Sequence, residues 1–264
     1  EKLSGVKIDA LALEDLFACA RKAGDDEIAR VRTLAEQHLG GLEDVDQEQL
    51  QNSLSLKVGL EDLRKSGKYD AFAIRCWPET FTEFGGAVCG AVSMMGEKRI
   101  PCACEADAYG ALTQLVLQAA SDDVVFLTDL VDVDVDDDSA VVWHCGQAPI
   151  SMQNPAYDAQ AIVHTNRKQP LLYQFPLKPG EFTFMRISQA QGMTTMVLGL
   201  GELLDRPMAF TGTSGVFRFR GGAGDALSKI INSGLEHHIA LAYGDHTNCL
   251  RAIASSMDLP VLEI

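Results

Sequence analysis

The sequence lacks the segments that direct a chain to a membrane, to the secretory route or to nucleic acid. No window approaches the roughly 18 uninterrupted apolar residues that a membrane-spanning helix requires, and no basic and apolar leader opens the chain. The 22 Lys and Arg residues against 37 Asp and Glu residues leave a net charge of −15, which repels phosphate backbones. We therefore expect a cytoplasmic protein with neither a membrane nor a nucleic acid as partner.

The sequence also lacks a cysteine framework of the kind that indicates disulfides. The seven cysteines are odd in number and scattered, and 264 residues suffice to bury a core without disulfides. This usage is typical of a reducing compartment. At roughly 150 residues per domain, the length predicts about two domains.

Helical periodicity dominates the first part of the chain. Apolar residues recur at helical spacing over residues 8–39 and 47–65, and a short buried strand is predicted at residues 71–76. The clearest helix is predicted at residues 107–120, which carry one apolar stripe. Residues 1–122 therefore have the organisation of an α/β domain.

Beyond Asp123 the periodicity changes to strand alternation. Most of the following segments are short, apolar or alternating, and Gly, Pro and Asn separate them. The end of the chain reads as a helix, a strand at residues 238–243, a second helix and a final strand. Such spacing is typical of a sandwich or a barrel, and we place the domain boundary near residue 123.

Two acidic residues are expected on buried faces. Glu105 lies at helical spacing before Tyr109 and Leu112, so a helix starting there would direct its carboxylate inward. Asp129 is in phase with Val131 and Val133, so it faces the core unless the strand is bulged. A buried ionised group costs several kcal/mol unless it is paired or binds a metal, which makes both residues candidates for a site.

Two histidines stand at the ends of predicted strands, where ligands gather. His144 ends one apolar strand, and His238 begins another after His237. Two carboxylates and two imidazoles suit manganese, iron, cobalt or zinc. The alternative is structural: Glu105 would be a helix N-cap partner, and each histidine a hydrogen-bonded core residue.

A zinc site on cysteines is the competing interpretation. It would use Cys102, Cys104, Cys145 and His144, but Cys102 and Cys104 lack the gap of two to four residues that structural zinc pairs use. The sequence also contains neither a P-loop nor a Gly-x-Ser-x-Gly elbow.

Six motifs, which together cover about residues 70–264, resemble the L-fucose isomerase and L-arabinose isomerase superfamily. They are RCWPE at 75–79, CACEADAYGALT at 102–113, FLTDLVD at 126–132, VWHCG at 142–146, EHHIA at 236–240 and YGDH at 243–246. Their order also agrees with that superfamily.

The resemblance implies a manganese-dependent aldose–ketose isomerase that acts on a monosaccharide through an enediol or enediolate. Glu105 and Asp129 match the two metal carboxylates, which would double as acid/base groups. His238 matches the histidine ligand, and His144 resembles the extra histidine ligand of the arabinose isomerase branch, with contact to the substrate as its alternative role. His237 is expected to contact the sugar.

The resemblance also implies an α/β middle domain, residues 1–122, followed by a mainly antiparallel β-barrel domain, residues 123–264, and so an α+β chain overall. Family members carry a further N-terminal α/β domain, and neighbouring subunits contribute to the sugar pocket. We therefore expect a fragment of a homo-oligomeric enzyme, in line with a sequence that starts at Glu1. Trp77 is expected to form an apolar wall against the sugar, with core packing as its alternative.

The rival function comes from a different class of protein. A non-catalytic sugar-binding or scaffold protein could keep the same fold without the reaction. Exchange of the sugar C2 proton with solvent separates the two, because a binding protein catalyses none.

Overall fold

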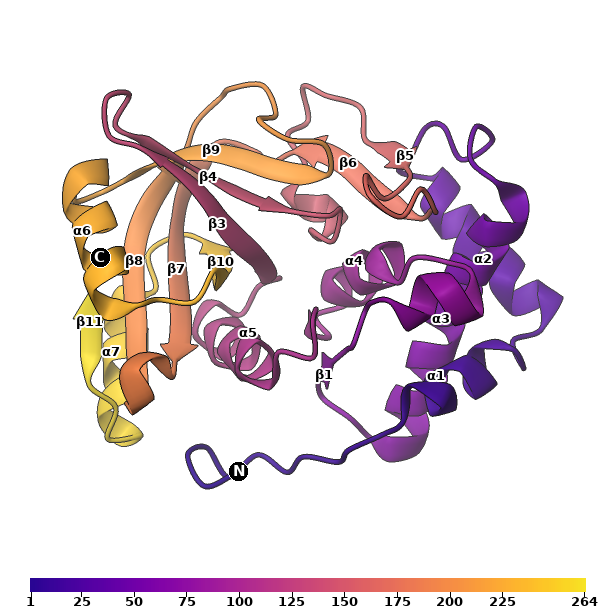
Figure 1. Cartoon of the computed structure of the whole chain (residues 1–264), viewed down its shortest axis with the longest axis horizontal. Coiled ribbons are helices and arrows are strands. Elements are labelled where there is room, and N and C mark those ends of the chain that lie inside the picture. Colours follow the sequence, from indigo (N-terminus) through magenta and orange to yellow (C-terminus); the bar gives the residue numbers. More distant parts are fainter.

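The helices of the first part of the chain gather on one side of the molecule, and a curved sheet with the two C-terminal helices lies on the other (Figure 1). The computed structural model describes all 264 residues. The first part of the chain holds helices α1 (Leu13–Ala20), α2 (Asp25–Glu36), α3 (Gln47–Gly67), α4 (Cys89–Glu97) and α5 (Ala108–Ser121). None of the helices in the molecule combines the length and the apolar character that crossing a membrane requires.

A small parallel sheet accompanies these helices. Strands β1 (Phe72–Ala73) and β2 (Cys102–Ala103) pair in parallel, and a π-helical turn follows at Thr80–Phe84. The predicted strand at residues 71–76 is therefore real but shorter than expected. The predicted long helix is confirmed as α5, whose N-cap Asp107 accepts a hydrogen bond from the Gly110 amide at 2.7 Å.

The remaining strands form one large mixed sheet. In sheet order they are β11, β8, β7, β10, β3, β4, β9, β6 and β5. Most neighbours are antiparallel, while β11 pairs in parallel with β8 and β6 with β9. Strand β8 also pairs with β9, placing Gly201 opposite Phe219, so the sheet curls back onto itself.

The boundaries of these strands follow the alternating segments of the sequence, except that no strand was expected at β5. The strands are β3 (Phe126–Asp134), β4 (Ser139–His144), β5 (Gln160–Ile162), β6 (Leu172–Pro176), β7 (Gly180–Ser188), β8 (Thr195–Leu203), β9 (Thr213–Phe219), β10 (His238–Tyr243) and β11 (Val261–Glu263). Helices α6 (Ala223–Ser233) and α7 (Thr247–Ser256) flank β10 in sequence, and short 3₁₀ turns occur at Ile150–Met152 and Ala190–Gly192.

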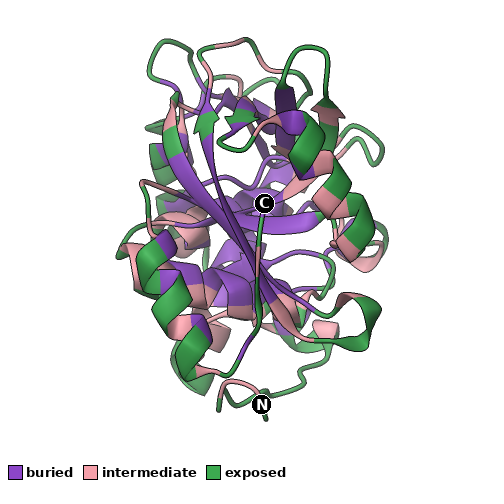
Figure 2. Ribbon diagram, turned by 90° about the vertical axis from the view of Figure 1, so that its left-hand side faces the viewer, coloured by how far each residue is buried: buried purple, intermediate pink, exposed green.

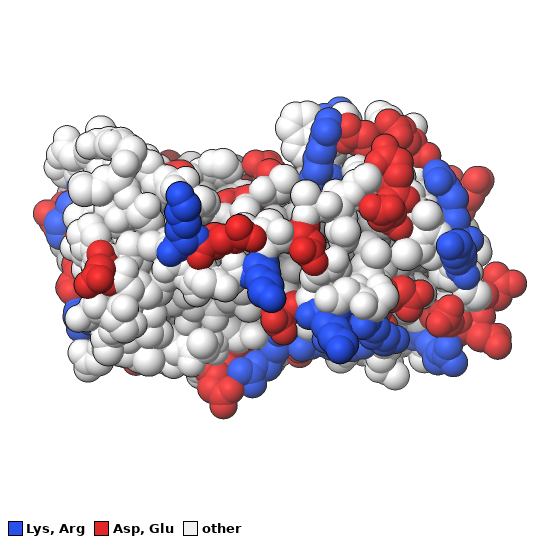
Figure 3. All heavy atoms as spheres, turned by 90° about the horizontal axis from the view of Figure 1, so that it is seen from below, with Lys and Arg blue, Asp and Glu red and all other residues white.

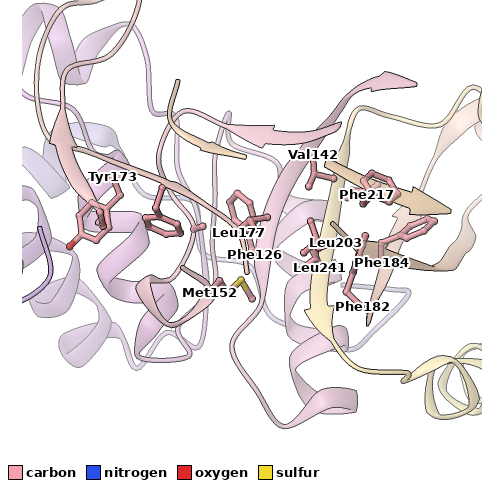
Figure 4. Packing of buried hydrophobic residues seen from close by; sticks show 14 of the residues in the cluster. Phe126, Val142, Met152, Tyr173, Leu177, Phe182, Phe184, Leu203, Phe217 and Leu241 are labelled. Carbon is pink, nitrogen blue, oxygen red and sulfur yellow. The ribbon is translucent and has the colours of Figure 1, made fainter. Parts of the chain in front are cut away.

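The largest apolar core fills the curve of the sheet (Figure 4). Phe182 and Phe217 lie edge to face with their ring centroids 5.2 Å apart, and both side chains are fully buried. The same cluster also takes Leu50 from α3 and Val31 from α2. Burial is therefore greatest along the strands, whereas the helices keep an exposed outer face (Figure 2).

Helix α5 joins the two sides of the molecule. It packs against β7 and β10 and also against β1 and β2. Its N-terminus therefore lies where the small parallel sheet meets the large one. This is the position of the residues described next.

Candidate functional site

Three neighbouring strands bring three predicted site residues together. His238 is the first residue of β10 and stands opposite Asp129 of β3, with its Nε2 3.3 Å from Asp129 Oδ1. His144 ends β4, which is the next strand after β3 in the sheet. The rings of His144 and His238 stack with their centroids 5.7 Å apart and their planes 25° apart.

The facing atoms of these side chains have no hydrogen-bond partner. Asp129 Oδ1, His144 Nε2 and His238 Nε2 are all buried and unpaired. The ligand atoms of the three residues lie within 4.8 Å of one another. Because buried polar atoms are nearly always paired in proteins, three orphaned atoms that converge indicate a place for a ligand.

Burial changes the acidity of this group. It raises the pKa of the Asp129 carboxyl to about 7. The charge of His238 lowers this pKa, and the negative charge of Glu105 raises it further. Burial lowers the pKa of His144 to about 3, and the neighbouring histidines add to this effect. Neutral imidazole is the form that can either bind a metal or donate a single hydrogen bond.

Glu105 reaches the site from a loop. Its backbone and that of Ala106 are left-handed, with φ values of 58° and 56°, and α5 begins only at Ala108. The prediction that Glu105 points into the core from the first helical turn is therefore wrong, and its side chain is 46% exposed. The reason is local: Asp107 has the short side chain that caps a helix, and the Ala106 amide bonds instead to the Ile74 carbonyl at 2.9 Å.

His237 lies between the two predicted metal carboxylates. Its Nε2 is 3.7 Å from Glu105 Oε2 and 3.9 Å from Asp129 Oδ1. Glu105, His237 and His238 form a second group whose ligand atoms lie within 4.8 Å of one another. Burial and the positive charge of His238 lower the pKa of His237. The structure thus gathers all five predicted acids and histidines at one site.

The inward orientation of Asp129 is confirmed, but its predicted phase with the following valines is wrong. The β3–β4 register shifts between Leu130 and Asp132, which marks a β-bulge. Val131 is the unpaired bulge residue and is 41% exposed, and past it Val133 packs against the main core, on the opposite face of the strand from Asp129. One extra residue is enough to turn the remainder of the strand over.

Asp107 and Arg186 are site residues that the sequence reading missed. Asp107 Oδ2 lies 2.9 Å from His238 Nδ1, and the same carboxylate contacts the Arg186 guanidinium at 2.5 and 3.0 Å. Burial alone raises the pKa of the Asp107 carboxyl, but His238 and Arg186 outweigh it and hold that pKa below its ordinary value. Only the N-cap position of Asp107 was visible in the sequence; Arg186 had no local signal.

The hydrogen bond between Asp107 and His238 also changes the pKa of the histidine. Burial alone lowers the pKa of His238, but the hydrogen bond to Asp107 and the charge of Asp129 raise it overall. A carboxylate behind a histidine is the usual support of a metal-binding imidazole. Carboxylate oxygens and imidazole nitrogens, unpaired and convergent, fit a divalent cation of the manganese, iron, cobalt or zinc type.

Neither Trp77 nor any cysteine belongs to these two groups of possible metal ligands. The Trp77 residue is 50% exposed, and the Arg167 guanidinium carbon lies 5.3 Å from its ring centroid. The zinc interpretation finds no support, because neither group of side chains close enough to share an ion contains a cysteine. Cys102 belongs to an apolar core cluster, and burial raises the pKa of its thiol.

Comparison with known proteins agrees with this geometry. Residues 142–264 match the family described as L-fucose isomerase, C-terminal domain. The chain is 33% identical over 257 residues to the sulfoquinovose isomerase of Priestia aryabhattai, which covers 97% of this chain and 57% of that protein. It is 32% identical over 262 residues to the sulfoquinovose isomerase of Alkalicoccus urumqiensis. That alignment covers 98% of this chain and 59% of the relative.

The fold and the site thus define an α/β protein with a large mixed sheet whose strand ends carry acids and histidines. The chain belongs to the fucose isomerase-like family, and the resemblance seen in its motifs is confirmed. It spans less than two thirds of the length of these curated relatives.

Proposed function

We propose that this protein is a metal-dependent aldose–ketose isomerase that works through an enediol or enediolate of an open-chain sugar. The observation that carries the proposal is the convergence of three unpaired buried atoms, from Asp129, His144 and His238, beside the Glu105 carboxylate. A structural cluster would pair these atoms with one another or with the protein. Here they have no hydrogen-bond partner, which supports a ligand shared between them.

The proposed metal ligands are Glu105, Asp129 and His238, with His144 as the predicted fourth. Mn²⁺ is the proposed ion. Another divalent cation that prefers oxygen and nitrogen ligands would use the same atoms. When bound, the cation would polarise adjacent sugar oxygens and stabilise negative charge on them, which is worth several kcal/mol.

The acid/base work falls to the carboxylates. His237 Nε2 is within 4 Å of both carboxylates, so a sugar bound between Glu105 and Asp129 would contact His237. One carboxylate can then remove the proton from one carbon and return a proton to the next. Positioned proton transfer of this kind contributes roughly 10²- to 10⁴-fold to a rate.

The proposed substrate class follows from the relatives. Both compared proteins are named sulfoquinovose isomerases, so we propose a sulfonated monosaccharide as the substrate. The half-exposed Trp77 under Arg167 offers an apolar ring next to a cation, which fits a sugar with an anionic end.

The proposal extends to the architecture. Residues 1–122 would form the α/β domain and residues 123–264 the β-barrel-like domain of a cytoplasmic homo-oligomer. The pairing of β8 with both β7 and β9 supports closure of the sheet. The face in Figure 3 shows basic side chains scattered among acidic ones, which supports a small-molecule rather than a nucleic-acid partner.

The experiment is isotope exchange with Mn²⁺ and sulfoquinovose in deuterated water. We expect exchange at C2 and formation of the ketose, both abolished in Glu105→Gln. Glu48→Gln, an exposed glutamate in the first turn of α3, serves as the matched control and should keep full activity. Binding of the sugar without any exchange would establish the rival, non-catalytic function.

A further inference from the structure

The stacked rings of His144 and His238 differ in their hydrogen-bond partners: a donor lies at one ring and an acceptor at the other. Both residues are only 3% exposed, and each ring has one nitrogen paired with the protein and the other unpaired. In both cases the paired nitrogen is Nδ1 and the unpaired one is Nε2. The hydrogen-bond partner at Nδ1 determines whether Nε2 of the same neutral ring carries a proton or a lone pair.

At His238 the partner can only accept a hydrogen bond. Asp107 Oδ2 lies 2.9 Å from Nδ1, and the carboxylate is also held by Arg186 and by the Gly110 amide. A carboxylate with a guanidinium and an amide on it is ionised and has no proton to give. The proton of the pair is therefore on His238 Nδ1, and when the ring is neutral the lone pair is on Nε2, which faces Asp129 Oδ1 at 3.3 Å.

At His144 the partner can only donate. The backbone amide of Cys145 donates to Nδ1 at 2.8 Å, and the side-chain nitrogen of Gln147 lies 3.1 Å from the same atom. A backbone N–H has no acceptor capacity, so Nδ1 holds the lone pair and Nε2 carries the proton. Turning the ring over would direct the Cys145 amide at a carbon and lose this bond.

We propose that the site holds the two histidines in opposite tautomers, so that His238 offers a lone pair to the cation and His144 offers an N–H to a sugar oxygen. This assignment revises the predicted ligand set, because a protonated Nε2 is a hydrogen-bond donor and not a metal ligand. The identity of the acceptor rests on the proposed function. A fixed donor in a buried site stabilises an oxygen that gains negative charge during enolisation.

Asp107 is a positioning residue in this arrangement. It touches neither sugar nor metal, and it acts by holding the Nδ1 proton of His238. Arg186 holds Asp107 in turn through two nitrogens.

The direct test is the tautomer of each ring in the metal-free protein. Long-range proton–nitrogen NMR spectra of histidine-labelled protein, recorded above the pH range in which histidine is charged, distinguish the two neutral forms. His144→Gln and His238→Gln assign the signals by loss. We expect protonated Nε2 in His144 and protonated Nδ1 in His238; two rings of the same tautomer overturn the proposal.

Metal titration gives a second, independent readout. By calorimetry with Mn²⁺, His238→Ala should lose at least about 10-fold in affinity, whereas His144→Ala should stay within about 3-fold of the wild type. His144→Gln, which restores an N–H donor, should recover part of the turnover that His144→Ala loses. An equal loss of Mn²⁺ affinity in both alanine variants contradicts the proposal.

The positioning role has a matched control. Asp107→Asn should weaken Mn²⁺ binding about 10- to 100-fold and shift His238 toward the other tautomer. Asp46→Asn makes the same substitution at another helix N-cap, where Asp46 Oδ1 accepts from the Gln49 amide at 2.9 Å, and it should change neither the Mn²⁺ affinity nor the His238 tautomer. Unchanged Mn²⁺ affinity and an unchanged His238 tautomer in Asp107→Asn would refute the positioning role. Opposite tautomers in a protein without isomerase activity would overturn the proposed function alone.

Discussion

Asp107 Oδ2 and His238 Nδ1 lie 2.9 Å apart, although 131 positions separate the two residues in the sequence. This contact links the N-cap of α5 to the first residue of β10. It connects helix packing to the orientation of an imidazole at the candidate site. Several measurable consequences arise from this link and from the unpaired atoms beside it.

Asp129 should make the metal-free protein less stable as the pH rises. Its folded-state pKa, about 7, lies above the ordinary value of 3.8, so its contribution favours folding at low pH and declines between about pH 4 and 7. A shift of this size corresponds to at most about 4 kcal/mol. Urea unfolding of Asp129→Asn should show a flatter pH dependence and, at pH 8, higher stability than the metal-free wild type.

Arg186 should be far more important for stability than a surface arginine. Arg186→Gln leaves the partly buried Asp107 carboxylate without the guanidinium of the buried Arg186, which we expect to cost about 3 kcal/mol. Arg220→Gln breaks an exposed pair with Glu181 and should cost less than about 1 kcal/mol. Denaturant unfolding of both variants checks the difference, and equal losses would count against a buried charge network.

Removal of metal should lower both activity and stability. Dialysis against a chelator is expected to abolish isomerisation, and Mn²⁺ should restore it. Because an ion that binds only the folded state stabilises it by mass action, Mn²⁺ at 100 times its Kd should add about 2.7 kcal/mol. Thermal unfolding with and without Mn²⁺ measures this, and in Glu105→Gln the gain should shrink.

Trp77 should act on substrate binding more than on the chemical step. If its half-exposed ring lies against the sugar, Trp77→Ala removes stacking of about 1 kcal/mol and raises KM roughly 5-fold with a smaller change in kcat. Arg167→Met should raise KM for a sulfonated sugar more than for a neutral one. Steady-state kinetics with both sugars would show this, and an unchanged KM in both variants would assign Trp77 to packing.

Much of the fold could be predicted because its elements have strong local signals. The apolar stripe of α5 and the short alternating strands from β3 to β10, with the exception of β5, are confirmed within a few residues. The sequence did not reveal the bulge after Asp129. Valine and aspartate alternate over residues 131–136, so a shift of one residue exchanges the two faces without changing the pattern. The conformation of Glu105 was also missed, because a helix start was placed by apolar spacing and not by the cap at Asp107.

The sequence by itself determined where the helices and strands form, and it placed acids and histidines at their ends, because periodicity and capping act over a few neighbouring residues. Only the tertiary structure decided which atoms meet. His238, Asp129 and His144 converge because β10, β3 and β4 are neighbours in the sheet, and Asp107 meets Arg186 because α5 packs on β7. The proton positions on the two imidazoles follow from such long-range contacts, and no local pattern of residues contains them.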